Sequence, residues 1–217
     1  MLSIIQNLIY TVPAVLIAIC FHEFAHGFVS YKLGDPTPKY EGRLSLNPKN
    51  HLDPLGTLAL ILFHFGWAKP VMVNPQYYKN KKLGMVEVAL AGPLMNFLIA
   101  FLSLLLYGVF LKYAYYIRIP SFLYRYLLTF FVMTTTINLG LGVFNLIPVP
   151  PLDGSKVLNS ILPADKYFAY MKYENYGQII ILVLLFTGFL TTPLNYFISR
   201  MMDGMLNIVA MILGMGV

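Results

Sequence analysis

The sequence predicts an all-α polytopic membrane protein with about five to six membrane helices and a small β element in a polar segment. Hydrophobic residues make up 58% of the 217 residues and charged residues only 11%, whereas an ordinary soluble domain carries roughly 25% charged residues. The apolar residues gather in runs along the whole chain, and a membrane span needs about 20 of them. We therefore expect the bilayer to be the solvent and residues 1–217 to form a single integral-membrane domain.

Apolar runs define the expected helices. Four runs are long enough to cross a bilayer and a fifth is marginal: 8–31, 84–111, 123–147, 177–198 and 201–217. Residues 55–67 would reach only about 20 Å as a helix, less than the ~30 Å hydrocarbon core. We expect this segment to be buried or re-entrant, with a full crossing as the alternative. Pro193 should end or kink the fourth run.

Two polar segments separate the early runs, and both favour irregular structure. Residues 32–54 are rich in turn-forming residues, and Val71–Val73 within 68–83 has the composition of a short strand. Later in the chain, residues 148–151 read Pro-Val-Pro-Pro. Because proline cannot continue a helix, the third run must end there.

The basic residues predict an orientation. If residues 55–67 do not cross, the segments 31–83 and 154–176 share a face and hold eleven of the fifteen Lys and Arg residues. Cytoplasmic segments carry such an excess, so we expect this face to be cytoplasmic and the N-terminus to lie outside. The net charge of +6 then suits anionic lipid headgroups, and we expect no nucleic-acid partner.

The first run carries an H-E-x-x-H motif, from His22 to His26. Positions i and i+4 share one face of a helix, so both imidazoles can reach one metal ion. Glu23 lies one position away and can accept a proton from a metal-bound water. Ionisable groups are costly in a spanning helix. The alternative, a helix-end trio that snorkels to the interface, is disfavoured because the apolar run continues to residue 31.

A catalytic zinc usually takes three protein ligands and leaves one position for water. The remaining histidines and the acids in or beside apolar runs are the candidates for the third ligand: His51, His64, Glu87, Asp153 and Asp203. Asp153 follows the proline-broken end of the third run, and irregular backbone at membrane depth is tolerated only when buried or lining a cavity. The first and third runs also end at the same face, so Asp153 can meet the His pair. A loop aspartate that only starts a turn is the alternative.

Other polar residues are weaker candidates. Asn145 could position substrate or form an interhelical hydrogen bond, and we weigh these two roles equally. His51 could line the access to the site, although a structural turn is the simpler account. His64 is expected to be an interfacial histidine. Cys20, the single cysteine, is expected to be a small packing residue.

Several further motifs accompany these residues and cover about residues 10–160: Asn145–Gly154, Leu46–Gly56, Gly66–Val71 and Ala91–Asn96. Together with H-E-x-x-H, they resemble the site-2 protease family of intramembrane zinc metalloproteases, in its compact form without a PDZ or CBS domain. The resemblance implies that His22, His26 and Asp153 bind one Zn²⁺ per chain and that Glu23 is the catalytic base.

The resemblance also implies a fold and a function. Three helices within about residues 8–160 would form the catalytic core, parts of 32–83 would form a small membrane-associated sheet, and C-terminal helices would follow at about 177–217. The expected activity is that of a metalloendopeptidase that hydrolyses a peptide bond in or near the transmembrane segment of a membrane-protein substrate. We expect a multi-pass protein of a prokaryotic plasma membrane, with its active site near the cytoplasmic face.

Two alternatives and one departure accompany this expectation. A metal-ion transporter with the same ligands would show metal flux and little dependence on Glu23, and a membrane-binding protein that does not cleave would retain its substrate. The sequence leaves the substrate, its regulator and the oligomeric state open. Ser155 stands where family members often have a second glycine after Asp-Gly. We expect this difference to change the local backbone rather than metal binding.

Overall fold

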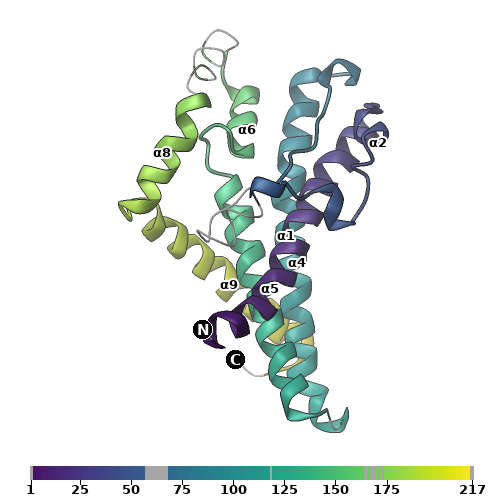
Figure 1. The fold of residues 1–217 in the computed structure, drawn as a ribbon, viewed down its shortest axis with the longest axis vertical. Helices are drawn as coiled ribbons and strands as arrows, with labels where there is room; N and C mark the ends of the chain where they lie inside the picture. The colour runs from purple at the N-terminus through teal and green to yellow at the C-terminus, as the bar shows by residue number, and fades with distance from the viewer. Residues whose placement is uncertain are drawn as a thin grey trace. The chain divides into compact units, whose positions relative to one another are not determined.

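The computed structural model describes residues 2–56, 68–117, 119–163, 166, 170, 172 and 174–215. Helices dominate these residues (Figure 1). The named elements are α1 (Leu2–Lys32), α2 (Thr37–Tyr40), the 3₁₀ turns η1 (Pro48–Asn50) and η2 (Pro75–Tyr77), α4 (Lys81–Ile117), α5 (Ser121–Asn145), α6 (Asp153–Ile161), α8 (Glu174–Phe186) and α9 (Thr191–Leu213).

Four helices in the described part of the chain are long and apolar enough to cross a membrane. These candidate spans are Leu8–Lys32 in α1, Lys81–Ala114 in α4, Ser121–Asn145 in α5 and Thr191–Leu213 in α9. The predicted helical architecture is therefore confirmed, and the four candidate spans support a multi-pass membrane protein, whereas the count of five to six spans is not confirmed. Residues 57–67, including His64, lie outside the described residues, so the predicted re-entrant segment stays a prediction.

The two C-terminal runs divide at a different place from the one predicted. The break lies between α8 and α9 at residues 187–190, not near residue 199. Gly188 adopts a φ of +76°, a conformation that favours glycine, and the Leu190 N–H donates to the Leu184 carbonyl at 3.1 Å. Pro193 lies in the first turn of α9, where a missing N–H leaves no helical hydrogen bond unmade. The expectation that Pro193 ends or kinks the fourth run is therefore wrong.

The predicted β element is not confirmed. Within the described residues the only β pairing is an isolated antiparallel bridge between Leu52 and Ala68, beside which the Lys69 N–H donates to the His51 carbonyl at 2.9 Å. Val71–Val73 is extended but joins no strand. Its first N–H donates to the side chain of Glu23 instead.

The chain groups into two compact units, which are described separately. The first comprises Met1–Ala18, Asn96–Phe144 and Leu184–Val217. Its helices approach closely at glycines: a Cβ at Gly142 would lie 2.5 Å from the Phe97 ring, and one at Gly108 would lie 2.7 Å from Leu213. Such small residues let spanning helices pack without a large side chain between them.

The polar interior of the first unit is neutral. Asn96 and Asn138 are both fully buried, and Asn96 Nδ2 donates to Asn138 Oδ1 at 2.9 Å and to the Ala18 carbonyl at 3.0 Å. Asn138 Nδ2 donates in turn to the Thr134 carbonyl at 2.8 Å. These bonds join α1, α4 and α5 without burying a charge.

The second unit comprises Ile19–Met95 and Asn145–Val183, and a buried carboxylate organises the end of α1. Asp35 is fully buried and accepts hydrogen bonds from Ser30 Oγ at 2.7 Å, Thr37 N at 2.9 Å and Asn74 N at 2.7 Å. Burial alone would raise the pKa of Asp35, but these hydrogen bonds favour the anion and hold that pKa below its ordinary value. The carboxylate thus ties α1 to the segment that precedes η2.

Candidate metal centre

The second half of α1 presents two imidazoles on one face. His22 and His26 are one helical turn apart, and their Nε2 atoms lie 2.9 Å from each other. The two rings meet edge to face, with centroids 4.5 Å apart. Both residues are buried: His22 is 5% exposed and His26 is 8% exposed. The helix spacing therefore places two nitrogen ligands close together in a buried position.

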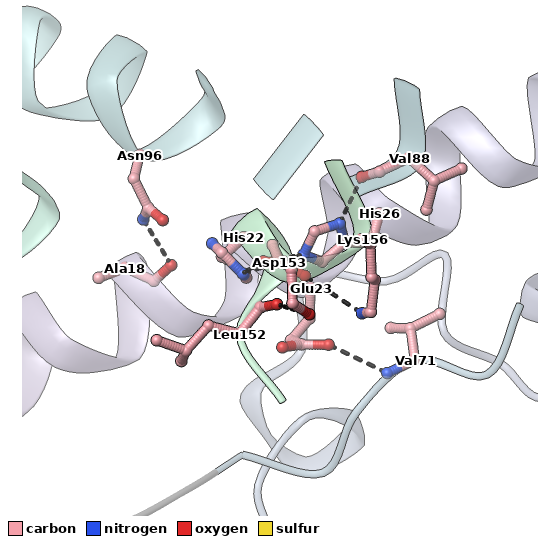
Figure 2. A network of polar contacts seen from close by, with 11 residues as sticks. Ala18, His22, Glu23, His26, Val71, Val88, Asn96, Leu152, Asp153 and Lys156 are labelled. Atoms are coloured by element: carbon pink, nitrogen blue, oxygen red, sulfur yellow. Dashed lines mark hydrogen bonds and ion pairs between the residues drawn. The ribbon is translucent and has the colours of Figure 1, made fainter. Parts of the chain in front are cut away.

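Asp153 completes this cluster from a distant part of the chain. It is the first residue of α6, directly after the proline-rich segment that follows α5. Its Oδ2 atom lies 3.2 Å from His22 Nε2 and 3.1 Å from His26 Nε2. Figure 2 shows the carboxylate facing both imidazoles. The structure therefore brings together the three side chains that the sequence singled out.

The chemistry of the three atoms fits a bound cation. His26 Nδ1 donates to the Val88 carbonyl at 2.7 Å, so Nε2 of the neutral ring carries a lone pair. That lone pair faces a carboxylate oxygen and a second imidazole nitrogen, an arrangement that a shared metal ion satisfies. Ligand atoms about 2.0–2.1 Å from a tetrahedral zinc would lie about 3.3 Å apart, close to the 2.9–3.2 Å seen here. His22, His26 and Asp153 can thus hold a zinc ion.

Glycine forms one wall of the cluster. A Cβ at Gly92 would lie 2.4 Å from His26 Nε2 and 2.6 Å from His22 Cε1, too close for any side chain. The backbone of α4 therefore lies directly against both imidazoles. On the same helix face, one turn earlier, the Val88 carbonyl accepts from His26 and fixes which nitrogen of that ring faces the cluster.

Asp153 is held as a carboxylate. It lies in the first turn of α6, where the helix dipole favours an anion, and Lys156 Nζ lies 3.2 Å from its Oδ1. Burial would raise the pKa of Asp153, but the His22 contact and the nearby Lys156 charge favour the anion and hold that pKa well below its usual range. The anionic form is the one that binds metal.

Glu23 lies beside the cluster and is anchored by backbone. Its Oε2 accepts a hydrogen bond from the Val71 N–H at 3.0 Å, which Figure 2 shows as a dashed line below the His and Asp side chains. Val71 belongs to the extended segment that follows the bridge at Ala68. This bond fixes one carboxylate oxygen of Glu23.

The two predicted substrate-positioning residues differ in exposure. Asn145 is the last residue of α5 and is half-buried. His51 is fully buried, and its Nε2–H donates to the Ser45 carbonyl at 2.5 Å. This contact favours the structural turn that the sequence left open for His51.

Ser155, in the first turn of α6, forms a hydrogen bond with the backbone just before the helix. It is 1% exposed, and its hydroxyl donates to the Leu152 carbonyl at 2.6 Å. A Cβ at the neighbouring Gly154 would lie 2.3 Å from the Leu146 carbonyl oxygen, so position 154 requires glycine. The hydroxyl adds a local hydrogen bond next to Asp153. That Ser155 leaves metal binding unchanged stays a prediction.

Sequence reasoning missed the roles of Gly92, Val88 and Lys156. Gly92 belongs to the Ala91–Asn96 motif, but the sequence did not indicate that this glycine packs against the two imidazoles. Lys156 lies three residues after Asp153, a spacing that places both on one helix face. Val88 acts through its backbone carbonyl, and side-chain identity gives no signal for such a contact.

Comparisons with known proteins agree with one another. The model of peptidase family M50 matches residues 114–188. The names of three relatives contain the words zinc metalloprotease: YwhC of Bacillus subtilis is 39% identical over 82% of this chain and 80% of its own, and Rip2 of Mycolicibacterium smegmatis is 30% identical over 86% and 70%. MJ0392 of Methanocaldococcus jannaschii is 29% identical over 88% of this chain and 47% of its own. No solved structure matches the chain significantly.

Proposed function

Because the chain belongs to peptidase family M50, we propose that it is a zinc metalloendopeptidase that cleaves a membrane-protein substrate in or near a transmembrane segment. The observation that carries this proposal is the convergence of His22 Nε2, His26 Nε2 and Asp153 Oδ2 within 3.2 Å of one another. Two of these ligands belong to a candidate span.

We assign His22, His26 and Asp153 to the zinc ion, which leaves a fourth position for water. Bound zinc supplies a Lewis acid that polarises the scissile carbonyl and acidifies water. The remaining chemistry belongs to the chain. Glu23 takes a proton from the attacking water and delivers it to the departing amine, and Val71 holds the carboxylate during both transfers.

The substrate segment must unwind before it is cut, because helical hydrogen bonds and side chains shield a peptide carbonyl.

Of the two residues predicted to position substrate, Asn145 stays in the proposal. His51 does not, because it is fully buried. If residues 55–67 do not cross the membrane, the eleven basic residues share one face, which favours a plasma-membrane protein with a cytoplasmic active site and an external N-terminus.

Replacement of Glu23 by Gln tests this function. Purified protein in proteoliposomes would be given a reporter with one transmembrane segment, and zinc would be measured alongside cleavage. We expect Glu23→Gln to keep its zinc and to lose at least ~100-fold in cleavage rate, because general-base catalysis contributes about 10²–10⁴-fold. Glu87→Gln, a change at an exposed acid on α4, should behave as wild type.

The alternatives give different results in the same experiment. A transporter would carry zinc across the vesicle membrane equally well in wild type and Glu23→Gln. Unchanged cleavage in zinc-loaded Glu23→Gln would overturn the assignment of Glu23. Absence of cleavage in all variants, together with zinc flux, would favour transport.

A further inference from the structure

Arg43 is a buried cation that no carboxylate in the described residues neutralises. It is 3% exposed, and the ion pairs in the described structure all involve Asp153. Its Nη2 atom donates instead to two backbone carbonyls, those of Lys69 at 2.6 Å and Pro70 at 2.5 Å. Burying a charge without an opposite charge costs free energy of folding. The buried Arg43 guanidinium is therefore a candidate for a functional role.

The second of these carbonyls belongs to the peptide unit that holds Glu23. The Pro70 C=O and the Val71 N–H are the two ends of one planar amide. Arg43 binds the oxygen end, and Glu23 Oε2 binds the nitrogen end at 3.0 Å. A single peptide therefore connects the buried guanidinium to the carboxylate beside the metal cluster (Figure 2 shows the Glu23–Val71 bond).

Two physical effects follow from this connection. In a trans peptide the C=O and N–H point in opposite directions, so a fixed oxygen aims the Val71 N–H at Glu23. A cation on the oxygen also polarises the amide and strengthens its N–H as a donor, as happens in hydrogen-bonded chains. Arg43 thus compensates the negative charge of Glu23 without touching it.

We propose that Arg43 is a positioning residue for Glu23, acting through the Pro70–Val71 peptide. The anchored Oε2 sets the direction of the carboxylate and leaves the other oxygen to exchange protons. This proposal rests on the proposed role of Glu23 as general base. The second contact of Arg43, at the Lys69 carbonyl, holds the preceding residue and keeps the segment from rotating.

Backbone hydrogen exchange tests the anchoring without any need for activity. Exchange in residues 68–73 would be followed by mass spectrometry in wild type, Arg43→Gln, Arg43→Lys and Glu23→Ala. We expect at least ~10-fold faster exchange in this segment for Arg43→Gln and Glu23→Ala, since each removes one end of the connection. Arg43→Lys should lie between Arg43→Gln and wild type, because Lys keeps the charge but loses the planar fork.

A matched control is Lys49→Gln, a change at an exposed base in the same polar segment, for which we expect wild-type exchange. Exchange in residues 68–73 that is the same in Arg43→Gln and wild type would overturn the proposal. If Arg43→Gln does not fold, Val71→Pro and Val71→Ala replace it, because only proline removes the N–H. Equal kinetic losses in these two variants would also overturn it.

Kinetics then separates positioning from a general structural role. In zinc-loaded protein, Arg43→Gln should lower kcat by roughly tenfold, a fraction of the general-base contribution, with KM unchanged and with partial recovery in Arg43→Lys. A loss of zinc or a rise in KM without a fall in kcat would contradict the proposal. Full cleavage by Glu23→Gln would refute the proposed base, whereas the exchange result would still decide whether Arg43 anchors the peptide.

Discussion

The two compact units bury different kinds of polar group. In the described residues, the first unit buries only neutral ones: Asn96, Ser103, Thr134, Thr135 and Asn138. Every buried His, Asp or Arg among the described residues belongs to the second unit: His22, His26, Asp35, Arg43, His51 and Asp153. Neutral amides can satisfy one another in a low-dielectric interior, whereas buried charges need an opposite charge, a metal or several hydrogen bonds.

This difference separates helix association from chemistry. The Asn96–Asn138 pair holds helices together and needs nothing further. The His22–His26–Asp153 cluster brings together lone pairs and a negative charge that a cation satisfies. Substitutions of the buried ionisable groups in the second unit should therefore change metal binding or pH response, and substitutions of the buried amides in the first unit should change stability alone.

Removal of Asp153 should have the largest effect. We expect Asp153→Ala to lose zinc and with it all measurable cleavage, because two imidazoles alone give too few ligands for a catalytic site. Zinc per chain in gently purified protein is the measurement, with Asp203→Ala as a control at an exposed acid in α9. Zinc held as tightly in Asp153→Ala as in wild type would show that the third ligand is another residue.

Gly92→Ala should come next, because its methyl group would lie 2.4 Å from His26 Nε2. We expect zinc affinity to fall by at least ~10-fold as the imidazoles are displaced, in the range seen when residues that orient metal ligands are changed. Gly204→Ala in α9, where a Cβ meets nothing within 4 Å, should leave zinc unchanged and stabilise the helix by roughly 0.5–1 kcal/mol. Equal zinc affinity in Gly92→Ala and wild type would mean that α4 does not form the wall of the site.

Asp35 should give the second unit a distinctive acid response. Its pKa is lowered in the folded protein, so the carboxylate stabilises the fold at neutral pH and loses this contribution as pH falls below its ordinary value of 3.8. We expect Asp35→Asn to cost about 1.5–3 kcal/mol at pH 7, as expected for hydrogen bonds to a charged group. The difference from wild type should shrink below about pH 4. Thermal unfolding in detergent across pH 3–8 would measure it, and a pH-independent difference would contradict the role of the charge.

Asn138→Ala should have the smallest effect. It removes the acceptor of Asn96 Nδ2, and interhelical hydrogen bonds of this kind average about 0.6 kcal/mol in a membrane protein. We expect a loss of about 0.5–2 kcal/mol in detergent unfolding, with zinc content unchanged. A loss of zinc in Asn138→Ala would break the distinction between the two units.

Much of the site was predictable because its side chains follow local rules. The i, i+4 spacing of His22 and His26 places them on one face, and the proline-broken helix end isolates Asp153. The positions of the long helices followed from apolar runs. These signals depend on residue type and on separation along the chain, both of which the sequence displays.

The contacts that organise the site could not be predicted in the same way. Val88 acts through its carbonyl and Val71 through its N–H. Any residue offers the same carbonyl, and any residue other than proline offers the same N–H. Arg43 meets Lys69 and Pro70 only after the intervening chain has folded back. The break at residues 187–190, where Gly188 adopts a positive φ, was also missed, because the predicted apolar run continues across it.

The wall formed by α4 has a consequence for how this sequence can change in length. Val88 and Gly92 are four residues apart, so the carbonyl and the glycine lie on the same side of the helix. An inserted residue between them would rotate one relative to the other by about 100°, whereas an insertion before Lys81 can be absorbed by the preceding turn. Insertions and deletions in related genes should therefore stop abruptly at this helical turn, even where the amino acids around it vary freely.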